Sequence, residues 1–224
     1  MLKKIFKCLF PRHSVIPLLV VLAFNMITYY GTKYVNLNRY HHDISTLVNV
    51  SIPFVPFFFL FYFIAYIQWV IGFILIAREN QQICYRYMSG ELIAKIITFV
   101  IFLIIPTTMI RPEIIGNGFF DKLVEFLYRI DTPRNLFPSM HCLESWLCFR
   151  GALKLKSIRK WYAPLSLIIT LLVFASTILI KQHVPLDIIG GILVVEIGLL
   201  VSKLTKADKL FDTINTKLKL TPQK

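Results

Sequence analysis

Two short groups of polar residues stand at the beginnings of two hydrophobic segments, and their residue types are those that phosphoryl transfer uses. The first group is Pro138-Ser139-Met140-His141, and the second is His183 followed by Asp187 one helical turn later. On a helix these last two share a face, so Asp187 can accept a hydrogen bond from Nδ1–H of His183 and leave Nε2 free to attack phosphorus. His141 can protonate the leaving oxygen. The pattern predicts a nucleophile, its orienting carboxylate and a general acid.

Phosphoryl oxygens also need hydrogen-bond donors or positive charge around them. Ser139 can donate to a phosphate oxygen, or it can serve only as the N-cap of its helix. The unpaired backbone N–H groups of a helix start favour an anion as well. Arg111, at the end of a third apolar segment, offers planar bidentate donors. The sequence contains no carboxylate-rich group that would hold a metal, so we expect neither a metal nor another cofactor.

The composition indicates an all-α integral membrane protein. Hydrophobic residues make up 56% of the 224 residues and charged residues 17%, and the mean hydropathy is +0.66. These values do not describe a soluble domain. Since a membrane helix needs about 20 mainly apolar residues, we predict six transmembrane helices in a single domain over residues 1–224. The predicted spans are roughly 15–32, 54–77, 91–110, 139–153, 161–180 and 184–202. The span at 139–153 is the shortest, and its composition would also allow a re-entrant or interfacial helix.

The distribution of lysine and arginine predicts the orientation, because cytoplasmic loops carry the excess. With six crossings, the amino terminus, the 78–90 loop, the 154–160 loop and the carboxyl tail share one side and hold most of the 25 basic residues. The opposite loops hold the minority: Lys33, Arg39, Arg111, Lys122, Arg129, Arg134 and Lys181. On this topology three segment ends, those with Arg111, His141 and His183, meet at the non-cytoplasmic face.

The net charge of +13 is explained by this topology and by attraction to anionic lipid headgroups. The basic residues are dispersed among apolar spans and form no basic face with interleaved aromatic residues, so no nucleic-acid partner is expected. The expected partners are the bilayer and a lipid phosphate. We expect a multi-pass protein of the cell (plasma) membrane.

Two further segments are amphipathic, and charged residues such as Lys95, Glu144 and Glu196 lie inside predicted spans. Residues 119–130, in the 113–137 outer loop, have apolar residues at helical spacing and predict an interfacial helix. The tail from Lys203 to Leu220 has the same character and predicts a cytoplasmic interfacial anchor. A charge inside a span costs roughly 2.5–3.5 kcal/mol on insertion scales, so we expect Lys95 and Glu196, at similar depths, to pair. Glu144 could tune the pKa of His141, or pair with Arg150 or a hydroxyl group.

The motifs resemble those of the type 2 phosphatidic acid phosphatase superfamily, whose signatures are written KxxxxxxRP, PSxH and SRxxxxxHxxxD. The matching residues stand in the same order and spacing: Arg111-Pro112, Pro138-Ser139-Met140-His141, and Ser176-Thr177 with His183 and Asp187. The resemblance implies metal-independent hydrolysis of a lipid phosphate. It also implies that His183 becomes a phosphohistidine, that Asp187 orients it, that His141 is the general acid, and that Arg111 and Ser139 bind phosphate.

The chain departs from these signatures at three positions. Ile104 stands in place of the first lysine, Met140 in place of the usual glycine, and Thr177 in place of the arginine. Lys181 and Arg134 could restore positive charge, although neither position is the family's. The Ser176-Thr177 pair followed by Lys181-Gln182-His183 resembles sequences of the branch that contains sphingomyelin synthases and inositol-phosphorylceramide synthases. Those enzymes transfer a phosphorylated headgroup to a lipid hydroxyl.

Three functions therefore stay open: a lipid phosphatase, a lipid phosphotransferase, and a catalytically silent protein that binds lipid phosphates. The substrate for any of them would be a glycerolipid, sphingolipid or polyprenyl phosphate.

Overall fold

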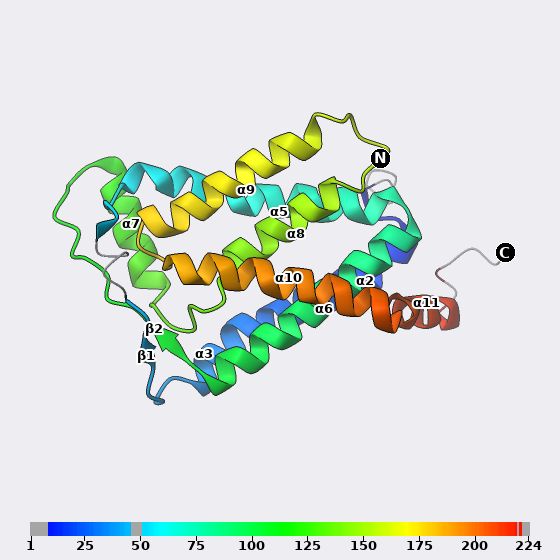
Figure 1. Cartoon of the computed structure of the whole chain (residues 1–224), viewed down its shortest axis with the longest axis horizontal. Coiled ribbons are helices and arrows are strands. Elements are labelled where there is room, and N and C mark those ends of the chain that lie inside the picture. The colour runs from blue at the N-terminus through cyan, green and yellow to red at the C-terminus, as the bar shows by residue number, and fades with distance from the viewer. Residues whose placement is uncertain (1–8, 46–50, 219, 221–224) are drawn as a thin grey trace.

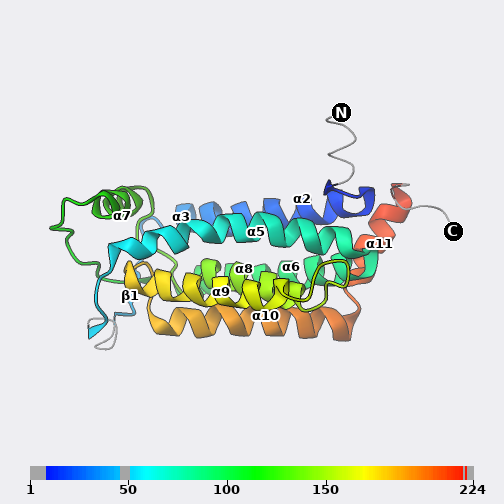
Figure 2. The ribbon, with the colours of Figure 1, turned by 90° about the horizontal axis from the view of Figure 1, so that it is seen from above.

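The long helices run side by side along one direction in the computed structural model, which describes residues 9–45, 51–218 and 220 (Figure 1). Seen from above, α2, α3 and α5 form one layer, and α6, α8, α9 and α10 form the other (Figure 2). The basic residues at positions 3, 4 and 7 and those after position 218 lie outside the described residues. Their predicted place on the cytoplasmic side stays a prediction.

Among the residues that the structure describes, five helices are long and apolar enough to cross a membrane, as expected of a multi-pass membrane protein. The first is continuous through α2 (Arg12–Met26), a π-helical turn (Ile27–Gly31) and α3 (Thr32–Val35). The others are α5 (Phe59–Glu79) with a 3-10 turn before it (Pro56–Phe58), α6 (Gln81–Ile104), α9 (Tyr162–Leu179) and α10 (Pro185–Thr205). The ends of four of them lie within a few residues of the predicted spans.

The fourth predicted span is a shorter helix, and the count of six membrane-spanning helices is not confirmed. Helix α8 (Met140–Ala152) has 13 residues, which at about 1.5 Å per residue covers roughly 20 Å of a ~30 Å hydrocarbon core. Nine of these residues are buried, and α8 packs against α5, α9 and α10. Because its neighbours cover it, α8 needs no long apolar surface toward lipid. Figure 1 shows α8 running lengthwise from the middle of the bundle toward the end where α11 lies.

The third predicted span begins and ends too late in the sequence. Helix α6 starts after Asn80, whose side-chain oxygen accepts a hydrogen bond from Ile83 N at 2.9 Å. It ends at Ile104, so Arg111 lies in the following loop and not at the helix end. The prediction excluded residues 81–90 because charges flank them. In the structure α6 runs through these residues: Arg86 lines a cavity between helices, and Glu91 and Lys95 are buried and paired.

The predicted pair of Lys95 with Glu196 is wrong. Lys95 Nζ lies 2.6 Å from Glu144 Oε1 and 3.6 Å from Glu91 Oε1, and the side chains of Lys95 and Glu91 are fully buried. Glu196 pairs with Arg150 at 3.2 Å and accepts a hydrogen bond from Trp146 Nε1 at 2.8 Å. Glu144 therefore pairs with neither Arg150 nor a hydroxyl group. The early start of α6 changes the depth of Lys95, and this accounts for the different partner.

The predicted helix at residues 119–130 is confirmed as α7 (Phe119–Ile130). Val124 and Leu127 are buried in a cluster with Tyr62 of α5 and Ile180. Both views show α7 across the end of the bundle, crosswise to the long helices (Figures 1 and 2). This orientation suits an interfacial helix, but its place in a membrane stays a prediction. The tail forms α11 (Asp208–Lys217), which lies at the opposite end of the bundle.

Candidate active site

His183 is fixed by the first turn of α10. Its Nδ1 lies 3.0 Å from Oδ2 of Asp187, and the same oxygen accepts the backbone N–H of Val184 at 3.0 Å. Pro185 begins the helix, where its missing N–H is not needed. Asp187 is fully buried, so its orientation is set by these bonds. This is the contact that the sequence predicts, and it favours the tautomer with the proton on Nδ1, which would leave Nε2 unprotonated.

His141 lies in the first turn of α8, and aromatic rings surround it. Its ring stacks on Tyr62 with centroids 4.2 Å apart and 26° between the planes, and Trp69 lies 5.1 Å away. Its Nε2 lies 3.3 Å from the hydroxyl of Tyr66. The ring centroids of His141 and His183 are 6.3 Å apart. Two histidines that are distant in sequence therefore face one small volume.

The two helices approach closely because α10 has glycines where they meet. A Cβ at Gly190 would lie 2.5 Å from the ring of Phe137, and one at Gly191 would lie 3.0 Å from the carbonyl oxygen of Ser139. The backbone N–H of Ser139 donates to the carbonyl of Asp187 at 3.2 Å. Larger residues at these glycines would separate the starts of α8 and α10, and with them the histidines.

The loop before α8 is held by hydrogen bonds to a strand and to the first span. Strands β1 (His42–Asp43) and β2 (Thr107–Thr108) form a short parallel pair, with His42 opposite Thr107. The hydroxyl of Thr107 accepts the backbone N–H groups of Leu136 and Phe137 at 2.8 and 3.0 Å. Asn135, at φ 55°, bonds through its side chain to Asn36 and to Thr32 of α3. These contacts bring the end of the first span to the site.

Both histidines line a cavity of about 30 Å³ whose other walls include charged residues. The lining residues are Tyr29, Lys33, Asp131, Arg134, Asn135, Leu136, Met140, His141, Gln182 and His183. Lys33 pairs with Asp131, and the hydroxyl of Tyr29 donates to the same carboxylate at 2.7 Å. Burial alone would raise the pKa of Asp131, but the Lys33 ammonium and these hydrogen bonds lower it below its usual value.

Lys33 and Arg134 supply positive charge that the signature positions lack. Ile104 is 66% exposed, and Thr177 is buried with its hydroxyl donating to the carbonyl of Phe174. Neither lines the cavity. The guanidinium of Arg134 has no ion-pair partner among residues 9–45, 51–218 and 220. Sequence reasoning found Arg134 but missed Lys33, although the charge distribution already assigned Lys33 to the side of the histidines.

Arg111 does not line the cavity; it lies behind residues that do. Its Nη2 donates to Gln182 Oε1 and its Nη1 to the carbonyl of Asp131, both at 2.6 Å, and its Cζ lies 4.6 Å from the ring of Tyr128. Burial lowers its pKa, but a guanidinium stays charged. Gln182 and Asp131 both line the cavity, so Arg111 holds two wall residues. Its direct contact with phosphate stays a prediction.

Two other predicted phosphate ligands also lie off the cavity. Ser139 is fully buried, and its Oγ accepts a hydrogen bond from Cys142 N at 3.3 Å as the N-cap of α8. Lys181, at φ 54°, donates through Nζ to the carbonyl of Ile52 at 2.5 Å, and burial lowers its pKa. Neither lines the cavity. Their roles in phosphate binding stay predictions, and the geometry favours the capping role that the sequence left open for Ser139.

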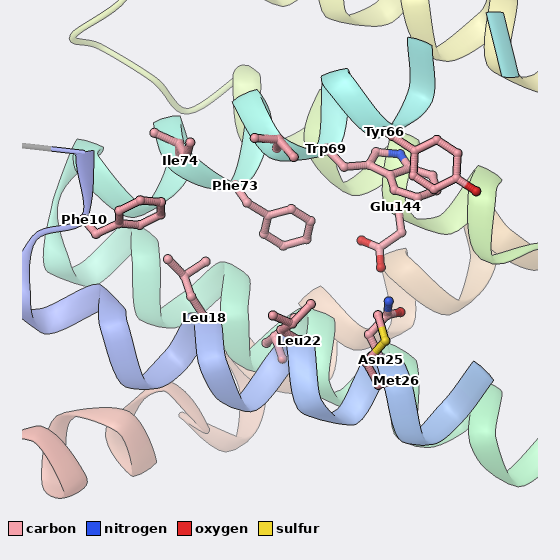
Figure 3. Close-up of a pocket in the computed structure, with 12 residues that line it drawn as sticks. Phe10, Leu18, Leu22, Asn25, Met26, Tyr66, Trp69, Phe73, Ile74 and Glu144 are labelled. Carbon is pink, nitrogen blue, oxygen red and sulfur yellow. The ribbon is translucent and has the colours of Figure 1, made fainter. Parts of the chain in front are cut away.

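A larger apolar groove of about 430 Å³ lies between α2 and α5 and reaches the aromatic residues around His141 (Figure 3). Leu18 and Leu22 of α2 face Phe73 and Ile74 of α5 across it. Tyr66 and Trp69, which contact His141, also line it. The groove therefore provides an apolar surface next to the general-acid candidate.

The sequence matches the profile of the PAP2 superfamily over residues 39–201. This range contains both histidines, Asp187, Arg111 and Arg134, but it begins after Lys33 and the rest of the first span. Comparison with curated proteins and with solved structures gave no match.

Proposed function

The chain belongs to the PAP2 superfamily, and from this membership we propose that it hydrolyses a lipid phosphate through a phosphohistidine formed on His183. Membership suggests a phosphatase or phosphotransferase of lipid phosphates in a membrane. The observation that carries the finer proposal is the arrangement of His183, bonded to Asp187 at 3.0 Å, beside His141 at 6.3 Å on one cavity.

The proposed reaction has two balanced steps. Nε2 of His183 forms a bond to phosphorus while the bond from phosphorus to the lipid oxygen breaks, and protonated His141 gives its proton to that oxygen. A water molecule then attacks the phosphohistidine, His141 takes the proton of the water, and inorganic phosphate leaves. Lys33 and Arg134 stabilise the negative charge of the phosphoryl oxygens. Asp187 stabilises the positive charge on the imidazole of His183.

The groove supports a lipid as the substrate. Its volume of about 430 Å³ is within the range of roughly 300–1,000 Å³ that is typical of ligand sites. Its walls are mainly aliphatic and aromatic side chains. A hydrocarbon chain there would bring the attached phosphate toward Tyr66 and His141. The cavity of about 30 Å³ is far smaller than the roughly 300 Å³ at the lower end of ligand sites. Binding therefore requires movement of a wall residue such as Met140, whose side chain is unbranched and flexible.

The proposed topology places this site on the non-cytoplasmic face of the cell membrane. The lysine-rich 154–160 loop and α11 lie at the end of the bundle opposite to α7 (Figure 1). The positive-inside rule assigns that basic end to the cytoplasm. In a Thr132→Cys variant, the new cysteine in the loop after α7 is expected to react with a membrane-impermeant thiol reagent that is added to intact cells.

Phosphate release by the purified protein is expected to persist in excess EDTA. Among the described residues no three His, Cys, Asp or Glu side chains are grouped as metal ligands, and the proposed steps use only side chains. The assay uses a panel of glycerolipid, sphingolipid and polyprenyl phosphates in detergent, with phosphate release as the measurement. Adding diacylglycerol or ceramide separates hydrolysis from transfer, since transfer yields a new phospholipid instead of phosphate. If no substrate of the panel is turned over and no phosphohistidine forms, the result would favour a catalytically silent protein that binds lipid phosphates.

Replacing Lys33 with glutamine is expected to lower kcat/KM by about tenfold to a hundredfold, mainly through KM. This range corresponds to the ~1.5–3 kcal/mol of a hydrogen bond to a charged group. The substitution also removes the ion-pair partner of Asp131, so an unpaired carboxylate would lie next to the phosphate. Lys33→Arg should restore most of the activity. Lys122→Gln removes an equal charge from an exposed position on α7 and serves as the control. An unchanged KM in the Lys33 variant would remove Lys33 from phosphate binding.

A further inference from the structure

A second charged cavity, of about 330 Å³, lies at the end of the bundle opposite to the histidines. It lies between the start of α6, the end of α8 and the end of α10. Four cations line it: Arg86 from α6, Arg150 from α8, Lys154 just after α8, and Lys203 from α10. Glu196 is the one carboxylate in its lining. The proposed reaction uses none of these residues.

The charges in this cavity do not balance. Glu196 pairs with Arg150 at 3.2 Å, whereas Arg86, Lys154 and Lys203 have no ion-pair partner among the described residues. The Nε atoms of Arg86 and Arg150 are buried and lack a hydrogen-bond acceptor there. The lining thus carries three formal positive charges in excess, together with unused donors that face no protein acceptor.

The helices that carry these cations are bonded to one another, which keeps the residues around the same cavity. The hydroxyl of Tyr87 on α6 donates to the carbonyl of Arg150 at 2.7 Å, which joins α6 to α8. The hydroxyl of Ser202 on α10 donates to the carbonyl of Arg86 at 3.3 Å, which joins α10 to α6. Like charges held together repel one another, and a bound anion relieves this repulsion. Guanidinium groups suit phosphate because their parallel N–H donors match two of its oxygens.

We propose that this cavity binds the phosphate headgroup of an anionic phospholipid from the leaflet opposite to the active site. The apolar part of the lining favours a lipid over free phosphate. Ile83, Leu199 and Leu200 line the same cavity, and Leu200 is 55% exposed on the surface of α10. The phosphate lies among the cations while the acyl chains lie along α10 in the bilayer. Basic pockets between membrane helices are suited to such headgroups.

Lipid retention by the full chain tests this proposal without any assay of catalysis. The protein is placed in phosphatidylcholine nanodiscs with a graded fraction of phosphatidylglycerol, and the lipids that stay bound are counted by native mass spectrometry. The Arg86→Gln/Lys203→Gln double variant is expected to bind phosphatidylglycerol about thirtyfold more weakly than the unmodified chain. This follows from ~1 kcal/mol for each basic residue near a charged headgroup, at 1.4 kcal/mol per tenfold.

Two further variants separate a specific site from a loss of general charge or of stability. Arg159→Gln/Lys209→Gln removes the same charge outside this cavity, from the 153–161 loop and from α11, and should retain the lipid. Glu196→Gln removes the competing carboxylate and should strengthen retention about fivefold, an effect that partial unfolding would not produce.

Equal retention of phosphatidylcholine and phosphatidylglycerol by the unmodified chain would overturn the proposal. So would equal loss in the control double variant, or weaker retention in Glu196→Gln. Displacement of the lipid by an equal concentration of inorganic phosphate would show that the site takes the free ion, and would overturn the assignment to a lipid.

Discussion

Replacing His183 with alanine is expected to reduce turnover of the lipid phosphate by on the order of 10⁴-fold or more, to background. The substitution removes the nitrogen that forms the bond to phosphorus, and no other described side chain shares its position beside both His141 and Asp187. The loss should appear in kcat, because Lys33 and Arg134 remain to bind the substrate. Phosphate release is the first measurement. The second is the acid-labile phosphohistidine trapped with radiolabelled substrate, which should be absent from the variant.

The control for this experiment is His42→Ala. His42 is an exposed histidine in β1, at the same end of the bundle, so the control changes the same residue type without touching the cavity. Its activity should equal that of the unmodified chain. The thermal midpoints of both variants should stay within a few degrees of the unmodified chain, which would exclude a folding defect. Undiminished turnover or a persistent phosphohistidine in His183→Ala would assign the nucleophile to another residue.

The sequence predicted the parts of the fold that depend on local pattern. The apolar residues at helical spacing in 119–130 sufficed for α7, and four of the long helices follow from long hydrophobic runs with few charges. The prediction failed for the first turns of α6, because it placed residues 78–90, with Arg86, in a loop, and it gave Lys95 the wrong partner. Hydropathy counts each charge as though it faced lipid, whereas here the ion partner of Lys95 comes from α8. Long-range pairing of this kind has no local signal.

The contact between His183 and Asp187 was predictable from the sequence, whereas the cations that line the cavity were less so. His183 stands two residues before α10 and Asp187 stands in its first turn, so the local chain at the helix start is enough to bring them together. Lys33 reaches the cavity only because the first span continues to Val35 and because Asn135 bonds to Thr32 beside it. Lys181, adjacent in sequence to the catalytic segment, instead donates to the carbonyl of Ile52. Neither proximity in sequence nor the predicted side of the membrane singled out the cations that line the cavity, since Lys181 satisfies both criteria and does not line it.

Replacing Asp187 with asparagine is expected to lower kcat by on the order of 10³- to 10⁴-fold, with little change in KM. The amide oxygen of asparagine can still accept the N–H of Val184, so the first turn of α10 is kept. What the variant lacks is the negative charge that fixes the Nδ1–H tautomer and stabilises positive charge on the imidazole as Nε2 bonds to phosphorus. A carboxylate-to-amide change of this kind in a histidine-based site costs about 10⁴ in kcat.

Rapid mixing with radiolabelled substrate resolves this prediction, because it separates formation of the phosphohistidine from its hydrolysis. In Asp187→Asn the formation step should become rate-limiting, so that labelled protein does not accumulate. A thermal midpoint close to that of the unmodified chain would confirm that the cap is retained. If Asp187 acted only as a helix cap, the variant would keep its kcat, since the amide preserves the bond to Val184. The size of the kcat effect thus distinguishes an orienting carboxylate from a structural one.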